Sequence, residues 1–364
     1  MKKIFLHAYD QINLGDDLFI HTIVNRYPNV KFYMWSDIQN RITFRVLEKL
    51  TILNKDSKFL GFLQKVRPSF AARYKAWWEK RCDAVVYIGG SIFIEYDNWK
   101  QILNWWEYEA ENRPFYALGA NFGPYRSEEY RKNLYDIFEK MQDVCFRDRY
   151  SYQKFEGNKS VRCASDILFS IEMPKVEQIK RQIFFSVIDV DTKDEGKNIL
   201  SIYSKEYIEK ISEVIKEYVQ KGYSIVISSF CKIEGDENAI NKILNHLSNC
   251  SRKFIYTLNY DGTNAEEILK EIASSEGIIA SRFHAVILGI AAGRPVFPIV
   301  YSDKTIHALE DMNFKGEYVD IRNLQELDFV KVQKNLSKLP VYPINELRES
   351  AQKHFKKLDE VLKE

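Results

Sequence analysis

Gly277-Ile-Ile-Ala-Ser-Arg-Phe-His-Ala285 is the stretch that decides the fold class. Its apolar run predicts a short buried strand that ends at Ala280, and Ser281 is a suitable N-cap for a helix that follows. That helix pattern stops at Gly293-Arg-Pro295, where another apolar run begins. A strand, a turn, a helix and a second strand in this order form the repeating unit of an open parallel sheet.

The same alternation runs along the rest of the chain. The predicted strands are Lys3–Leu6, Val30–Met34, Ala84–Ile88, Phe115–Leu118, Val144–Phe146, Ile183–Ile188, Ser224–Ser228, Lys253–Tyr256, Gly277–Ala280 and Pro295–Val300. Longer stretches with a helical period separate them. We therefore predict an α/β fold of two Rossmann-like parallel-sheet domains that face each other across a cleft.

Length and composition agree with two domains. The chain has 364 residues, of which 45% are hydrophobic and 29% are charged, as expected for folded domains of ordinary size. Residues 172–182 are charged and poor in strand formers, so we expect a linker there between an N-terminal domain (1–173) and a C-terminal domain (182–342). Residues 343–364 are expected to form a helix that packs back across the hinge.

Arg282 and His284 form the strongest candidate site, because both are expected at the start of a helix that follows a strand. Free N–H groups and the helix dipole favour an anion at such a position. An arginine adds a fork suited to phosphate or carboxylate, and a histidine adds a proton donor near neutral pH. Lys304 follows the next strand and is expected at the same sheet edge. The alternative is a surface arginine and a structural histidine.

Other candidates lie at the strand-to-helix turns of the first half. Asn13 and Gly15 suit a tight turn, after which Asp16 either caps a helix or orients a sugar hydroxyl. The pair Gly89-Gly90 ends a strand and allows a ligand to approach the backbone closely. Arg147 also follows a strand, and its alternative is a surface ion pair with Asp148.

Asp189-Val-Asp191 also follows an apolar strand and has the Asp-x-Asp spacing of some metal sites. Three residues of this kind arise easily by chance. We therefore predict no metal site.

Charge distribution suggests an anionic ligand or surface. Residues 1–182 carry 29 lysines and arginines against 23 aspartates and glutamates. Residues 58–81 concentrate seven basic residues among aromatic ones, which is typical of a helical hairpin that touches anionic lipid. The alternative is a hairpin packed on the sheet. No recognised nucleic-acid module is present, so no nucleic-acid partner is expected.

The ordered motifs resemble those of the polysaccharide pyruvyl transferase family. The resemblance spans about residues 4–304, and its motifs are Asn13-Leu-Gly-Asp-Asp, Gly89-Gly90, Gly119–Pro124, Arg147-Asp-Arg-Tyr-Ser151, Ser165-Asp166, Ser281-Arg-Phe-His-Ala, Gly293-Arg-Pro295 and Tyr301-Ser-Asp-Lys304. Two positions depart from the family pattern. Ser91 stands where a third glycine is common, and His7-Ala8 replaces the glycine usual at the first turn.

The resemblance implies a fold like that of the GT-B glycosyltransferases and transfer of a pyruvyl group from phosphoenolpyruvate to two hydroxyls of one sugar. The product is a cyclic ketal in a surface or capsular polysaccharide precursor. On this basis we expect phosphoenolpyruvate to bind Arg282, Arg147, Ser281 and Lys304, and His284 to act as the acid. Asp16 is expected to orient or deprotonate an acceptor that also contacts Asn13, Gly89 and Gly90.

These steps require no cofactor, because phosphoenolpyruvate is a co-substrate. We expect a cytoplasmic protein, since no apolar run approaches the roughly 20 residues of a membrane span and no secretory signal is present. A further hypothesis is that the protein contacts the inner face of the membrane, where its acceptor would be lipid-linked. The rival functions are a GT-B sugar-nucleotide glycosyltransferase and a non-catalytic saccharide-binding protein of a polysaccharide assembly system.

Overall fold

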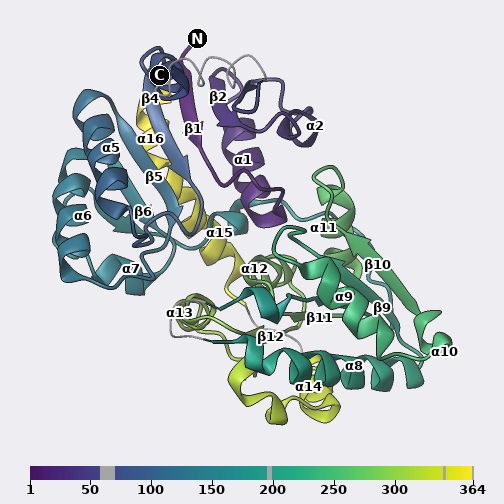
Figure 1. The fold of residues 1–364 in the computed structure, drawn as a ribbon. Coiled ribbons are helices and arrows are strands. Elements are labelled where there is room, and N and C mark those ends of the chain that lie inside the picture. Colours follow the sequence, from purple (N-terminus) through teal and green to yellow (C-terminus); the bar gives the residue numbers. More distant parts are fainter. Residues whose placement is uncertain (58–69, 195–198, 339–341, 363–364) are drawn as a thin grey trace. The chain divides into compact units, whose positions relative to one another are not determined.

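The computed structural model describes residues 1–57, 70–194, 199–338 and 342–362. It divides the chain into two compact units. The first unit consists of residues 1–10, 16–170 and 347–364, and the second of residues 11–15 and 171–346. Each unit is built on its own parallel sheet (Figure 1).

The first unit contains a seven-stranded sheet in the order β3-β2-β1-β4-β5-β6-β7. Its strands are all parallel and comprise β1 (Lys3–His7), β2 (Lys31–Ser36), β3 (Leu50–Asn54), β4 (Ala84–Ile88), β5 (Phe115–Ala120), β6 (Asp143–Phe146) and β7 (Val161–Cys163). Every residue of β5 and β6 is buried, as expected for central strands that helices cover on both faces.

Helices α5 (Trp99–Asn112) and α6 (Glu128–Lys140) pack against each other and cover one face of this sheet (Figure 1). The other helices of the unit are α1 (Leu14–Arg26), α2 (Asn40–Thr43), α4 (Phe70–Glu79), α7 (Arg149–Gln153) and α16 (Lys356–Leu362). Helix α15 (Ile344–Gln352) begins in the second unit and ends in the first.

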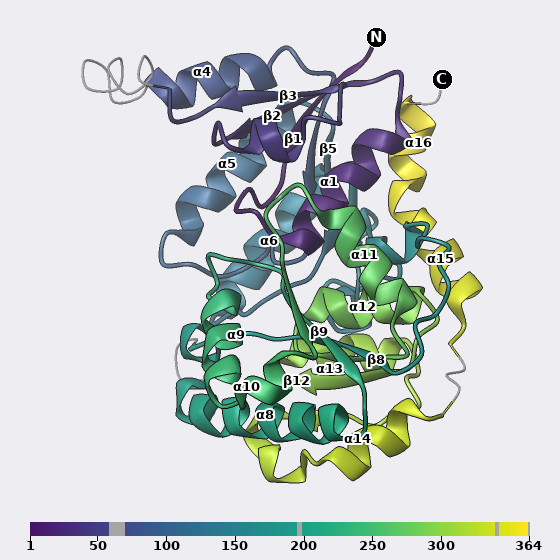
Figure 2. The same cartoon turned by 90° about the vertical axis from the view of Figure 1, so that its right-hand side faces the viewer.

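The terminal helix α16 lies alongside α1 (Figure 2). Arg26 Nε lies 3.0 Å from Asp359 Oδ1, and Tyr27 donates its hydroxyl to the same oxygen at 2.7 Å. Earlier in this C-terminal segment, Ser165 N donates to Ser350 Oγ. These contacts tie residues 347–362 to the first unit although more than 180 residues separate the bonded partners in the chain.

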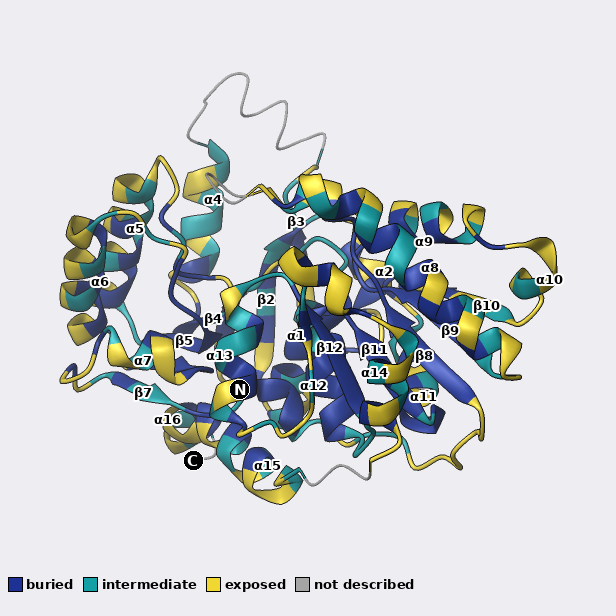
Figure 3. Ribbon diagram, turned by 90° about the horizontal axis from the view of Figure 1, so that it is seen from below, coloured by how far each residue is buried: buried dark blue, intermediate teal, exposed yellow. Residues whose placement is uncertain are grey.

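The second unit contains a six-stranded parallel sheet in the order β10-β9-β8-β11-β12-β13. Its strands are β8 (Gln182–Ser186), β9 (Ser224–Ser229), β10 (Ile255–Asn259), β11 (Gly277–Ala280), β12 (Val296–Val300) and β13 (Val319–Asp320). All residues of β8, β11 and β12 are buried (Figure 3). The two sheets confirm the predicted pair of Rossmann-like domains.

Helices α8 (Ser204–Gln220), α9 (Asp236–Asn245) and α14 (Phe329–Leu336) share one hydrophobic core with this second sheet. The remaining helices are α10 (Asn249–Arg252), α11 (Ala265–Ser274), α12 (Phe283–Ala291) and α13 (Asp303–Asp311). Helix α12 is buried from Ala285 to Ala291, which explains why its sequence is apolar on every side.

Residues 58–69 of the expected basic hairpin lie outside the described residues. The part that follows forms α4, in which Trp78 packs 4.9 Å from the ring of Tyr33 on β2. Trp77 is exposed, and the guanidinium of Arg81 covers its ring. Within the described ranges, no helix is both long and apolar enough to cross a bilayer.

Candidate functional site

The candidate residues of the first unit gather where β1, β4, β5 and β6 end. Arg147 follows β6 and is buried, with its Nη1 2.9 Å from Asp166 Oδ2 and its Nη2 3.0 Å from Asn121 Oδ1. Burial raises the pKa of Asp166, and the adjacent Arg147 opposes that rise. Arg147 is therefore part of a buried polar cluster and not the surface pair with Asp148 considered above, since Asp148 caps α7.

The Gly89-Gly90 turn belongs to the same cluster. A Cβ atom built on Gly90 would lie 2.4 Å from Arg147 Nη2, so any larger residue would displace the guanidinium. A Cβ atom on Gly89 would lie 3.9 Å from Asp16 Oδ1. The structure thus brings Asp16, the glycine pair and Arg147 together, as expected for turns at one sheet edge.

In the second unit, Ser281 is not the N-cap that the sequence predicts. Helix α12 begins at Phe283, and Arg282 occupies the N-cap position with an extended backbone. Ser281 N still donates to Ser186 O of β8, so this residue continues the hydrogen bonding of the sheet. Its hydroxyl lies 2.8 Å from the hydroxyl of Tyr207 on α8.

Arg282 is buried, and two carboxylates hold it. Its Nε donates to Asp236 Oδ2 at 2.8 Å, its Nη2 donates to the other oxygen of Asp236, and its Nη1 donates to Glu234 Oε2 at 2.5 Å. Asp236 is itself fixed, because it also accepts from Phe230 N and Cys231 N. A guanidinium has five N–H donors, so the three bonds found among the described residues leave two for a ligand.

Glu234 also binds Lys193, which gives a network of two cations and two anions. Burial would raise the pKa of Glu234, but Arg282 and Lys193 together lower it to about 2. Glu234 and Lys193 are functional candidates that the sequence reasoning missed. The local signal was limited to the polar loop after β9, which contains Glu234 and leads to Asp236 at the start of α9.

His284 is the second residue of α12 and packs against the segment 11–15. A Cβ atom built on Gly15 would lie 1.6 Å from His284 Nδ1, so only glycine leaves room for the imidazole. The segment is held by a bond from Leu14 N to Phe230 O and by an antiparallel bridge between Asn13 and Cys231. Asn13 also accepts from Gly15 N through its side chain, which forms a local turn.

Two other sequence motifs have clear positions. Lys304 lies in the first turn of α13, directly after β12. Asp189 and Asp191 both bind Lys242, at 3.1 and 2.6 Å. Both carboxylates of this Asp-x-Asp motif are therefore ion-paired with one lysine on α9.

Comparison with known proteins identifies the family. The sequence model described as polysaccharide pyruvyl transferase matches residues 13–303, which is most of the chain. The chain belongs to the polysaccharide pyruvyl transferase family. This match confirms the resemblance drawn from the ordered motifs, and it includes both Asn13 and the turn at Arg282.

One relative of this family member is a polysaccharide biosynthesis protein by name. The amylovoran biosynthesis protein AmsJ of Erwinia amylovora is 21% identical over 268 residues, which cover 68% of this chain and 63% of that protein. The match therefore spans less than two thirds of the relative's length.

Solved structures share the fold of this pyruvyl transferase family member at low sequence identity. UDP-GlcNAc 2-epimerase from Methanocaldococcus jannaschii aligns with a TM-score of 0.61 at 12% identity and covers 99% of this chain and 100% of its own. Anabaena Alr3699/HepE in complex with UDP and glucose aligns with a TM-score of 0.60 at 11% identity, with 100% and 99% coverage. These similarities confirm a GT-B-like fold of two Rossmann-like domains.

Proposed function

We propose that this protein transfers the pyruvyl group of phosphoenolpyruvate to two hydroxyls of one sugar in a surface or capsular polysaccharide precursor. The family supports pyruvyl transfer in polysaccharide synthesis. The observation that carries the donor assignment is the entrance of α12, where Arg282 at the N-cap retains two N–H donors and His284 follows two residues later. Helix entrances with free N–H groups favour phosphate and carboxylate, and phosphoenolpyruvate carries both.

In the proposed reaction, His284 donates a proton to the methylene carbon of phosphoenolpyruvate, which becomes the methyl group. Its Nδ1 edge packs on Gly15, so we assign Nε2 as the donor. One sugar hydroxyl attacks the resulting cationic carbon, the C–O bond to phosphate breaks, and a second hydroxyl closes the ketal. Of the two hydroxyl protons that are released, one returns to His284 and the other protonates the departing phosphate.

The anionic donor requires cations as phosphate leaves. We assign Arg282 and Lys304 to this role together with the Ser281 turn, and Arg147 stays a predicted ligand of the same substrate. Arg282 is held from behind by Asp236 and Glu234, which fixes its orientation before the ligand binds. Such fixed donors stabilise developing charge without reorganisation.

The acceptor residues remain proposals as well. Asp16 lies beside the Gly89-Gly90 turn, which suits a carboxylate that orients a sugar hydroxyl there. Asn13 groups with the second unit, where its side chain forms a local turn. A lipid-linked acceptor and contact of residues 58–81 with anionic membrane belong to the same proposal.

Phosphate release from phosphoenolpyruvate, measured over a panel of saccharide acceptors, tests the function. We expect acceptor-dependent release that is lost in Arg282→Ala and His284→Ala. Consumption of a UDP-sugar with no phosphate release from phosphoenolpyruvate would replace this proposal by glycosyl transfer. If His284→Ala kept most of the turnover while Arg282→Ala lost it, His284 would be a positioning residue and not the acid.

A further inference from the structure

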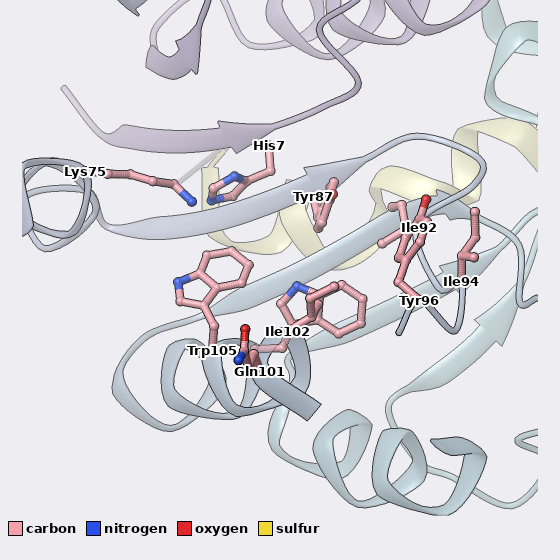
Figure 4. A pocket seen from close by; sticks show the side chains of 10 residues that line it. His7, Lys75, Tyr87, Ile92, Ile94, Tyr96, Gln101, Ile102 and Trp105 are labelled. Atoms are coloured by element: carbon pink, nitrogen blue, oxygen red, sulfur yellow. The ribbon is translucent and has the colours of Figure 1, made fainter. Parts of the chain in front are cut away.

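A pocket of about 390 Å³ lies entirely within the first unit (Figure 4), and Arg147 is not among the residues that line it. Strands β1 and β4, the loop after β4, and helices α4 and α5 supply its walls. Its lining includes His7, Lys75, Tyr96, Gln101 and Trp105. The volume is in the range of roughly 300–1,000 Å³ that small-molecule sites occupy.

The positive charge of Lys75 in this pocket is balanced by the negative charge of Glu79. Glu79 is buried behind it, and its Oε1 lies 3.1 Å from His7 Nε2 and 3.4 Å from Lys75 Nζ. Burial and the nearby Lys75 lower the pKa of His7 to about 4, although Glu79 opposes this, so the imidazole is neutral at pH 7. The pocket offers one paired cation and no net charge, which disfavours a dianion such as phosphoenolpyruvate.

Aromatic side chains make up much of the remaining lining. Trp105 is covered, because Lys75 Nζ lies 4.4 Å from the centre of its ring and the His7 ring meets the same indole edge-on at 5.0 Å. Tyr96 is half-exposed. Figure 4 shows His7 and Lys75 pointing toward each other above Trp105, with Gln101 near the same indole. Aromatic faces beside a few hydrogen-bonding groups match a pyranose ring, which has an apolar C–H face and a rim of hydroxyls.

The rim of the pocket is fixed by backbone bonds. Asn121 N donates to Gly90 O at 2.7 Å, Gly123 N to Phe93 O at 2.8 Å, and Glu95 N to Pro124 O at 3.0 Å. These bonds hold the loop that carries Ile92, Ile94 and Tyr96, and the same loop begins at the Gly89-Gly90 turn. A site with a preformed wall loses less entropy when a ligand binds.

We propose that this pocket binds a neutral pyranose ring of the acceptor saccharide, with its C–H face against the ring of Tyr96 and its hydroxyls toward the hydrogen-bonding groups of the lining. The role of this sugar as the acceptor rests on the proposed function, whereas its binding to the pocket does not. The pocket thereby selects an uncharged sugar residue and excludes the anionic donor.

Saturation-transfer NMR with the full chain tests this inference, with methyl β-D-glucopyranoside, methyl β-D-galactopyranoside and the methyl glycoside of N-acetylglucosamine as probes. At least one glycoside should bind, and Tyr96→Ala should weaken it about fivefold, since an aromatic contact contributes roughly 1 kcal/mol. Tyr96 is half-exposed, so its loss should leave the fold intact. Tyr108→Ala is the matched control, because this tyrosine on α5 is similarly exposed and lies outside the pocket lining.

Absence of binding by all three glycosides would overturn the inference, as would equal binding by Tyr96→Ala and wild type. Geraniol, an uncharged prenol, serves as the competing probe. Its binding in place of the glycosides would assign the pocket to an apolar chain. A parallel thermal-shift titration with phosphoenolpyruvate separates the two proposals, because loss of that shift alone would contradict the donor assignment and leave the sugar pocket standing.

Discussion

His284 packs against Gly15 so closely that a Cβ atom at position 15 would lie 1.6 Å from the imidazole Nδ1. The two residues are far apart in the sequence, and they meet because Leu14 N bonds to Phe230 O beyond the end of β9. The glycine thus sets the position of the side chain that we propose as the proton donor. The imidazole can occupy this position only because residue 15 has no side chain.

Gly15→Ala should therefore displace His284 and reduce acceptor-dependent phosphate release on the order of 100-fold, the effect of about 1 Å of misplacement. The double variant Gly15→Ala/His284→Ala is the control. If position 15 acts through His284, the double variant will be no slower than His284→Ala alone. Additive losses would contradict this relationship.

Asp236→Asn should destabilise the second unit by roughly 3–5 kcal/mol, because it removes one charge from a buried pair and leaves Arg282 undercompensated. Asp236 also accepts from two backbone N–H groups, so its loss affects the loop after β9. Urea unfolding followed by circular dichroism measures the change. Glu237→Gln is the matched control on the same helix, since its carboxylate lies 4.0 Å from Lys232, and equal stability of the two variants would refute the assignment.

Acid should remove the contribution of Glu234 to stability. Arg282 and Lys193, acting against burial, lower its pKa from 4.5 to about 2. The free energy that this ionised carboxylate adds is therefore fully present above about pH 4.5 and is lost as the pH falls toward 2. Unfolding free energies of wild type and Glu234→Gln should converge between pH 5 and pH 2.5, and a constant difference over that window would disprove the prediction.

Gly90→Ala should move the guanidinium of Arg147, because its Cβ would lie 2.4 Å from Nη2. Loss of a hydrogen bond to a charged group costs roughly 1.5–3 kcal/mol, which corresponds to a rise of about 10- to 150-fold in the KM for phosphoenolpyruvate if Arg147 binds it. Initial-rate kinetics of phosphate release measure this. An unchanged KM would remove Arg147 from the donor site.

The sequence was sufficient for the central strands, because apolar runs such as Ala84–Ile88 and Gly277–Ala280 mark segments that the sheets bury. It was insufficient for the outer strands β3, β7 and β13, which were not predicted. Strand β7 has three residues and β13 has two. Their strand conformation comes from pairing with β6 and β12 and not from a pattern of their own.

The same limit applies to the candidate site. Local pattern placed Arg282 and His284 at a helix entrance, but it placed the N-cap at Ser281, because pairing of that residue with β8 leaves no local signal. The carboxylates that hold Arg282 come from a different strand-to-helix turn. The grouping of residues 11–15 with the second unit depends on a backbone bond across more than 200 residues, which no periodicity can predict.

A thermal-shift titration with phosphoenolpyruvate tests the central claim most directly, because it requires no knowledge of the acceptor. At 100 times its dissociation constant a ligand adds about 2.7 kcal/mol, a visible rise in Tm. We expect phosphoenolpyruvate to raise the Tm more than inorganic phosphate does, and we expect Arg282→Ala to abolish that excess while UDP has no effect. A rise with UDP and none with phosphoenolpyruvate would contradict the account.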